Sequence, residues 1–285
     1  MQKLLGLGII ILCVFGGFVL ASGRLIALWQ PAELIIIFGA GMGAMVLAHP
    51  KTVLIDLKNQ LIALFSKKTD RTATMKELLS VMHALLELVR KQGMKAIDEH
   101  VESWQQSSFF LQYPKVHSDP VLIQFITDNF RMLSMGKITA HELEAILEQE
   151  IESLEEDLLK PSEAMHTTGE AMPGFGILAA VMGIIITMSK LDGPLMAIGL
   201  HVGAALVGTF IGIFMCYCLF EPLSNALATR VSHKIKLLEC VKSIMVSHVS
   251  GKSPILAVDA GRKLIDREAK PSFIEMEKWL TDKAA

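Results

Sequence analysis

The chain has 285 residues, of which 52% are hydrophobic, 20% charged and only 6% aromatic. This balance argues against a purely soluble protein and against an aromatic-rich cofactor box, so no cofactor is expected. The formal net charge of −2 predicts no attraction to nucleic acid. The four cysteines form no CxxC pair, which favours buried thiols over a disulfide framework or a zinc site.

The N-terminal region contains two apolar runs, residues 4–21 and 34–48. The first run follows Lys3 and ends near Ala21 in small residues, which is the pattern of a signal peptide. The second run begins after a short connector, and this favours two membrane spans joined by a tight turn. Pro31-Ala32-Glu33 supplies the first turn of the second span, which is otherwise shorter than the ~20 residues that a crossing needs.

Residues 51–168 change character, because many charged residues appear among apolar positions at helical spacing, such as Leu78 and Leu85. Tyr113-Pro114 and Asp119-Pro120 interrupt this helical pattern. Because no alternating strand pattern occurs, the region is predicted to be a helical domain. Its acidic stretch is most simply a solvated helix face.

A hairpin of two further spans is predicted within residues 169–222, near 171–188 and 196–220, joined by the polar turn 189–193. A charged tail, residues 223–285, is predicted to form one long helix to about residue 250 and then shorter helices. The expected fold is thus an all-α polytopic membrane protein. Residues 1–50 form spans one and two, 51–168 a helical domain, 169–222 spans three and four, and 223–285 a helical tail.

Basic residues near the predicted spans give the orientation. Lys51 and Lys58 follow span two, Arg230 and Lys234 follow span four, and the tight turns offer only Arg24 and Lys190. Positive charge accumulates on the cytoplasmic side of membrane proteins. Both termini, the 51–168 domain and the tail are therefore predicted to be cytoplasmic, and both tight turns are predicted to face the other side of the membrane.

Enzyme motifs are incomplete. His141-Glu142 begins like a zinc-protease motif, but position 145 is Ala145 and the second ligand is missing. Residues 174–179 imitate a dinucleotide fingerprint within an apolar helix that follows no strand. The spans contain no paired aspartates or Ser/His arrangement, so the chain is not expected to be an enzyme.

The hairpin has a face of small residues at helical spacing. They are Pro173, Gly176, Ala180, Gly183 and Thr187 on span three, and Ala205, Thr209, Gly212 and Cys216 on span four. Tight helix packing explains such a face. A second interpretation is that the face opens to a neighbouring helix or a narrow polar path, in which the hydroxyl of Thr209 binds water or an ion.

No predicted span has an ionisable acid or base near its middle, because Glu33, Glu170 and Glu221 stand at span ends. Ionisable groups inside a membrane are costly and usually mark function. An ion path along this hairpin would therefore take its titrating group from another chain, and a channel that acts alone is disfavoured. Pro173 and Pro222 are either helix punctuation or hinges, and the sequence leaves both open.

Four segments together resemble the MotA family, the stator proteins of the bacterial flagellar motor. They are residues 30–34, 173–183, 207–212 and 271–275, and the likeness covers nearly the whole chain. The resemblance implies a ring, understood as a pentamer, in the bacterial inner membrane around two MotB-like helices, whose membrane aspartate carries the ion. It also implies that the cytoplasmic domain pushes the rotor protein FliG.

Residue roles follow from the same resemblance. Arg90 matches the rotor-facing arginine, and the downstream acidic contact falls on Asp98, with Glu99 beside it. Pro173 and Pro222 match two prolines linked to torque generation. For Arg90 and Asp98, an ordinary solvated helix face is the alternative, since exposed ion pairs contribute only ~0–1 kcal/mol each.

The resemblance also predicts the ion. Sodium-driven relatives carry a hydroxyl on span three opposite the threonine of span four, whereas this chain has Ala180 opposite Thr209. A single hydroxyl offers too few oxygens for sodium, so the translocated ion is predicted to be a proton. The nearest alternative is a TolQ/ExbB-type energiser of outer-membrane processes, which is expected to have three spans.

Overall fold

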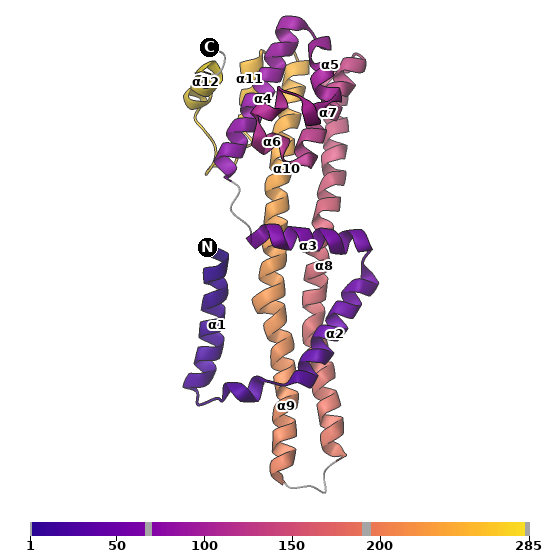
Figure 1. Ribbon diagram of the computed structural model, residues 1–285, viewed down its shortest axis with the longest axis vertical. Coiled ribbons are helices and arrows are strands. Elements are labelled where there is room, and N and C mark those ends of the chain that lie inside the picture. The colour runs from indigo at the N-terminus through magenta and orange to yellow at the C-terminus, as the bar shows by residue number, and fades with distance from the viewer. Residues whose placement is uncertain (1, 66–69, 190–194, 283–285) are drawn as a thin grey trace. The chain divides into compact units, whose positions relative to one another are not determined.

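The computed structural model describes residues 2–65, 70–189 and 195–282, and every regular element in these ranges is a helix (Figure 1). The chain forms two compact units. The first, called the hairpin unit here, contains residues 1–66 and 159–229, and the second, the distal unit, contains residues 67–158 and 230–285. Each unit therefore combines parts of the chain that are far apart in sequence.

The hairpin unit is built from long apolar helices. Its elements are α1 (Gln2–Leu20), the 3-10 turn η1 (Leu25–Leu28), α2 (Pro31–Ala48), α3 (Lys51–Phe65), the part of α8 (Ala140–Met188) from residue 159, α9 (Leu195–Phe214), the π-helical segment η4 (Met215–Phe220) and the start of α10 (Glu221–Val249). Pro31 occupies the first turn of α2, as the sequence predicted, because a helix leaves that N–H unpaired in any case.

The core of the hairpin unit lies where α2, α8 and α9 meet. Its buried side chains include Ile37, Met172, Ala179, Ile211 and Phe220. Helix α2 packs against α9. On α1, the ring of Phe15 meets the rings of Phe210 and Phe214 edge-on, with centroids 6.3 and 5.4 Å apart. These contacts hold the N-terminal helices against α8 and α9.

The distal unit is a cluster of shorter helices around a well-filled core. It contains α4 (Arg71–Gln92), α5 (Lys95–Glu102), η2 (Trp104–Gln106), η3 (Phe110–Gln112), α6 (Pro114–His117), α7 (Pro120–Met135), the first part of α8, the rest of α10, α11 (Pro254–Arg262) and α12 (Phe273–Asp282). The side chain of Asp119 caps α7 by accepting from the N–H groups of Val121 and Leu122. At the two predicted interruptions, Pro114 and Pro120 are the first residues of α6 and α7. The long tail helix ends at Val249, close to the predicted residue 250.

Three helices within the described ranges are long and apolar enough to cross a membrane. They are Pro31–Ala48, Ala140–Met188 and His201–Val249, and a shorter apolar helix covers Leu5–Leu20. The predicted spans 34–48 and 171–188 fall in the first two of these helices, and the predicted span 196–220 overlaps the third from His201 onward. The turn predicted at 189–193 lies, except for Ser189, outside the described residues. The four-span count, the side of the membrane on which each segment lies and the predicted domain boundaries remain predictions.

Candidate ion-path site

Helices α8 and α9 approach each other through glycines. A Cβ atom built on Gly176 would lie 2.8 Å from the carbonyl oxygen of Gly208, and one on Gly212 would lie 2.5 Å from that of Met172. No side chain fits at either position without moving the backbone, because both obstacles are main-chain atoms. For Gly176 and Gly212, the predicted small-residue face is therefore a helix-packing surface.

Thr209 stands at the edge of this contact. Its Cα atom would be 3.2 Å from a Cβ on Gly176, and its side chain is half-buried. Within the described part of the chain, the hydroxyl of Thr209 has no hydrogen-bond partner, whereas Thr187 donates its hydroxyl to the carbonyl of Gly183 over 2.8 Å. Thr209 thus keeps a hydroxyl available for water, an ion or another chain. Ala180 is also half-buried, directly after the buried Ala179.

Glu33 is the functional candidate that sequence reasoning missed. It stands in the first turn of α2, as expected, yet only 7% of its surface is exposed. Its carboxyl group lies against Gly208 of α9 and Gly183 of α8. In the described residues its Oε2 atom is buried without a hydrogen-bond partner. The only sequence signal is the pair of glycines, and nothing in the sequence pairs them with this glutamate.

Pro222 follows a distortion of the helix. The N–H of Glu221 donates to the carbonyl of Cys216, five residues back, which is the π-helical pattern of Met215–Phe220. Pro222 has no N–H group, so even a regular α-helix would lack the backbone hydrogen bond that residue 222 would donate. Such π-helical segments are frequent at functional sites. By contrast, Pro173 lies half-buried inside the continuous helix α8.

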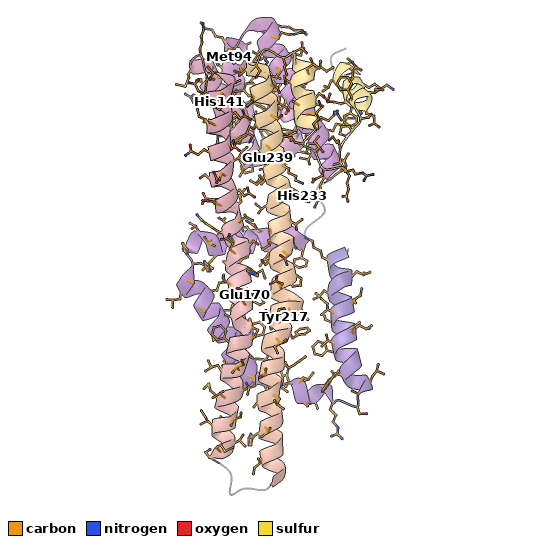
Figure 2. The ribbon with its side chains drawn as sticks, turned by 180° about the vertical axis from the view of Figure 1, so that it is seen from behind. Met94, His141, Glu170, Tyr217, His233 and Glu239 are labelled. Carbon is orange, nitrogen blue, oxygen red and sulfur yellow. The ribbon has the colours of Figure 1, made fainter. Side chains whose placement is uncertain are left out.

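The two prolines belong to neighbouring stretches of α8 and α10. His166 of α8 approaches Glu221 of α10 with its Nδ1 atom (3.1 Å) and Glu170 of its own helix with its Nε2 atom (3.4 Å). Figure 2 labels Glu170 on α8, with Tyr217 of the π-helical segment nearby. Slightly further along, Ser162 and Ser224 exchange hydrogen bonds through their hydroxyl and carbonyl oxygens. Polar contacts thus tie α8 and α10 together close to the two prolines.

The predicted rotor-facing residues lie in the distal unit at the junction of α4 and α5. Arg90 is in the last turn of α4, and 58% of its side chain is exposed. It forms an ion pair of 2.8 Å with Glu87, which Lys91 approaches at 3.7 Å. The chain then turns at Gly93, whose φ of 82° favours glycine.

The acidic partners follow immediately in α5. Asp98 is half-buried in the first turn and Glu99 is exposed. Helices α4 and α5 pack together, with Arg90 at the end of the first and the two acids near the start of the second. Burial lowers the pKa of His83 on α4; the charge of Glu87 raises it, while those of Arg90 and Lys91 lower it further. The lowered pKa favours the neutral form of His83.

Comparison with known proteins shows which family the chain resembles. Residues 4–93 match the motility protein A N-terminal family, and residues 118–240 match the MotA/TolQ/ExbB proton channel family. The chain is 51% identical to chemotaxis protein LafT of Vibrio parahaemolyticus, with 99% of each chain covered. It is 35% identical to motility protein A of Salmonella typhimurium, covering 97% of this chain and 94% of that protein. The chain belongs to the motility protein A family.

Solved structures agree on the fold of this motility protein A family member. The MotAB structure of C. jejuni matches with a TM-score of 0.74 at 19% identity, covering 94% of this chain and 96% of that one. The flagellar MotAB stator complex of Bacillus subtilis matches with a TM-score of 0.70 at 24% identity, covering 90% and 92%. The resemblance found in the sequence is confirmed. The relatives favour the flagellar stator over the TolQ/ExbB-type alternative.

Proposed function

We propose that this motility protein A family member is the stator subunit of a bacterial flagellar motor and couples proton flow across the inner membrane to torque on the rotor. Its 51% identity over almost the full length to a chemotaxis protein carries the proposal. The family model over residues 118–240 describes proton channels, and this supports the proton as the translocated ion.

The partner is a MotB-like single-span protein that supplies the membrane acid. Structures similar to this chain are MotAB complexes, which supports this partner and an assembly of several copies, as in the expected pentameric ring. In this arrangement the hydroxyl of Thr209 serves the ion path beside Ala180. Its lack of a partner in the described part of the chain supports that role.

Transmission to the rotor uses the other unit. Four spans place both termini and the rotor-facing region in the cytoplasm, where Arg90, Asp98 and Glu99 meet charged residues of FliG. Pro173 and Pro222 act as hinges between the ion path and this region. The π-helical segment that ends just before Pro222 supports a hinge there, because its backbone hydrogen bonds are already rearranged.

Complementation of a stator-deficient strain tests the function. The wild-type chain with its partner should restore swimming in sodium-free medium, and a protonophore should stop it. Thr209→Val should preserve membrane insertion and co-purification with the partner while lowering rotation speed severalfold. Thr229→Val is the matched control, because the Thr229 hydroxyl bonds to the carbonyl of Asn225 within its own helix. Strict dependence on sodium would overturn proton coupling, and normal speed in Thr209→Val would remove that residue from the path.

A further inference from the structure

Glu33 occupies a slot that the backbone of the hairpin leaves open. A Cβ atom on Gly208 would lie 2.7 Å from the Oε2 atom of Glu33, and one on Gly183 would lie 3.6 Å from its Oε1 atom. The two carboxyl oxygens therefore face glycines on two different helices, α9 and α8. Any larger residue at position 208 would displace the carboxyl group.

The walls of the slot are small and apolar. A Cβ on Gly183 would lie 3.1 Å from the Cβ of Ala205, and one on Gly208 would lie 3.4 Å from the Cβ of Ala179. Both alanines are buried. The slot thus offers space to the carboxyl group of Glu33 but no donor to its Oε2 atom, which is one of the few buried side-chain polar atoms without a partner in the described residues.

The surroundings provide no counter-charge. The titratable side chains on the described elements around Glu33 include Cys13 on α1, Arg24 before η1, His201 on α9, and Cys216, Tyr217 and Cys218 in the π-helical segment, with His166, Glu170 and Glu221 further along. None of these forms a hydrogen bond or ion pair with Glu33 in the described part of the chain. Lys190 and Asp192 lie outside the described residues.

A purely structural role of Glu33 is a poor match to these observations. An acid in the first turn of a helix gains ~0.3–1 kcal/mol from the helix dipole, and it does so when exposed. Burying an unpaired ionised carboxylate costs several kcal/mol, which exceeds that gain. A carboxyl group that binds a proton avoids the cost, because its neutral form is the one that such a slot tolerates.

We propose that Glu33 is a proton-binding site that this chain itself contributes to the ion path. The inference rests on the proposed function and deepens it: the partner's membrane acid is then one of two carriers. Glu33 stands at the start of α2, next to the turn predicted to face away from the cytoplasm. The ionised carboxylate of Glu33 therefore binds one proton on the side of the membrane where protons enter. The protonated carboxyl group then releases this proton towards the cytoplasm.

The experiment compares Glu33→Gln, Glu33→Asp and Glu33→Ala in stator-deficient cells that carry the partner. Glutamine keeps the shape but does not titrate. Single-motor speed at low load is measured while the external pH is raised from about 6 to about 8. Glu33→Gln should lower speed by roughly threefold to tenfold at the higher pH, where protons are scarce, and less at the lower pH. Glu33→Asp should retain part of the wild-type pH profile.

A second variant tests the slot itself. Gly208→Ala should displace the carboxyl group and reproduce the Glu33→Gln profile, but cause no further loss in the Glu33→Ala background. Gly203→Ala is the matched control on the same helix, because a Cβ there meets no atom within 4 Å. All variants are checked for co-purification with the partner.

The outcomes separate the two proposals. If the wild-type chain fails to restore proton-dependent rotation, the proposed function is wrong, whatever the variants do. If it succeeds and Glu33→Gln matches the wild type at every pH, the proton-binding role is wrong. A loss seen only in Glu33→Ala would then show that the side chain acts through its volume.

Discussion

The interior of each compact unit is stabilised in a different way. In the hairpin unit, helices meet through backbone contacts at Gly176 and Gly212, and a buried acid has no partner in the described residues. In the distal unit, large side chains such as Phe110 and Phe130 fill the core, and charged pairs such as Arg262 with Asp259 are satisfied. We therefore expect the hairpin unit to tolerate few added side-chain atoms where its helices meet. We expect the distal unit to tolerate few side-chain atoms removed from its core.

Removing volume from the distal unit should have the largest effect. Phe130 is fully buried, at 0% exposure, on α7. Phe130→Ala should lower the free energy of unfolding by about 3–5 kcal/mol, because it leaves a cavity in a close-packed core. Thermal or denaturant unfolding in detergent, followed by tryptophan fluorescence, measures this. Leu111→Ala is the control, since Leu111 is 55% exposed and the change should cost less than about 0.5 kcal/mol.

Adding volume to the hairpin unit should have the next largest effect. In Gly212→Ala the new methyl group would meet the carbonyl oxygen of Met172 at 2.5 Å, so α8 and α9 must separate. We expect a loss of about 1–3 kcal/mol from such overpacking. Thermal stability of the purified protein measures it, with Gly199→Ala as the control because its Cβ meets no atom within 4 Å. Equal stability of both variants would contradict the backbone contact.

Asp259 makes the stability of the distal unit dependent on pH. Its burial alone would raise the pKa of the carboxyl group, but hydrogen bonds from Arg262 and Lys263, together with their charges, lower that pKa overall. The ionised group therefore stabilises the fold above its unfolded pKa of about 3.9, and this contribution is lost as the pH falls through the lower folded pKa. Asp259→Asn should cost about 1–2 kcal/mol at pH 7.

That cost should shrink as the pH falls below about 4, because protonation then removes the same charge from the wild type. Unfolding curves of the two proteins between pH 3 and pH 7 check the prediction. A constant difference across this range would assign the effect to packing. Asp128→Asn is a suitable control, because this side chain is exposed and forms no ion pair within the described residues.

The smallest effect on stability is expected at the rotor-facing corner. Arg90→Glu removes an exposed pair with Glu87 and should change the free energy of unfolding by no more than about 1 kcal/mol. On the proposed function, it should nevertheless reduce swimming strongly, since charge reversal affects the contact with the rotor. Arg71→Glu, at an exposed position of α4, is a control of the same charge change on the same helix. Normal swimming of Arg90→Glu would disprove the rotor contact.

Much of the fold could be predicted from local sequence rules. Pro31, Pro114 and Pro120 mark helix starts, because proline suits the first turn of a helix. Two long apolar segments predicted helices near residues 171–188 and 196–220, but not that α8 runs without interruption from Ala140 to Met188. The joining of residues 230–285 with residues 67–158 into one unit was not predictable, because it depends on contacts between distant segments.

The candidate site was predictable to a lesser extent. The small-residue face of Gly176 and Gly212 followed from helical spacing. Glu33 was assigned only to a span end, since sequence position gives the depth of a residue along its own helix and not the neighbours it meets. The slot between Gly183 and Gly208 exists only once two other helices are in place.

The π-helical segment Met215–Phe220 has a consequence for the angular register of its helix. An α-helix advances about 100° per residue, so a bond that spans five residues instead of four accommodates one extra residue. Side chains after the segment, Pro222 among them, are therefore rotated by about one residue relative to a regular helix through Thr209. A helical wheel drawn across both residues would assign Pro222 to the wrong side. Deletion of one residue within the segment would restore the regular phase and turn the proline away from its present direction.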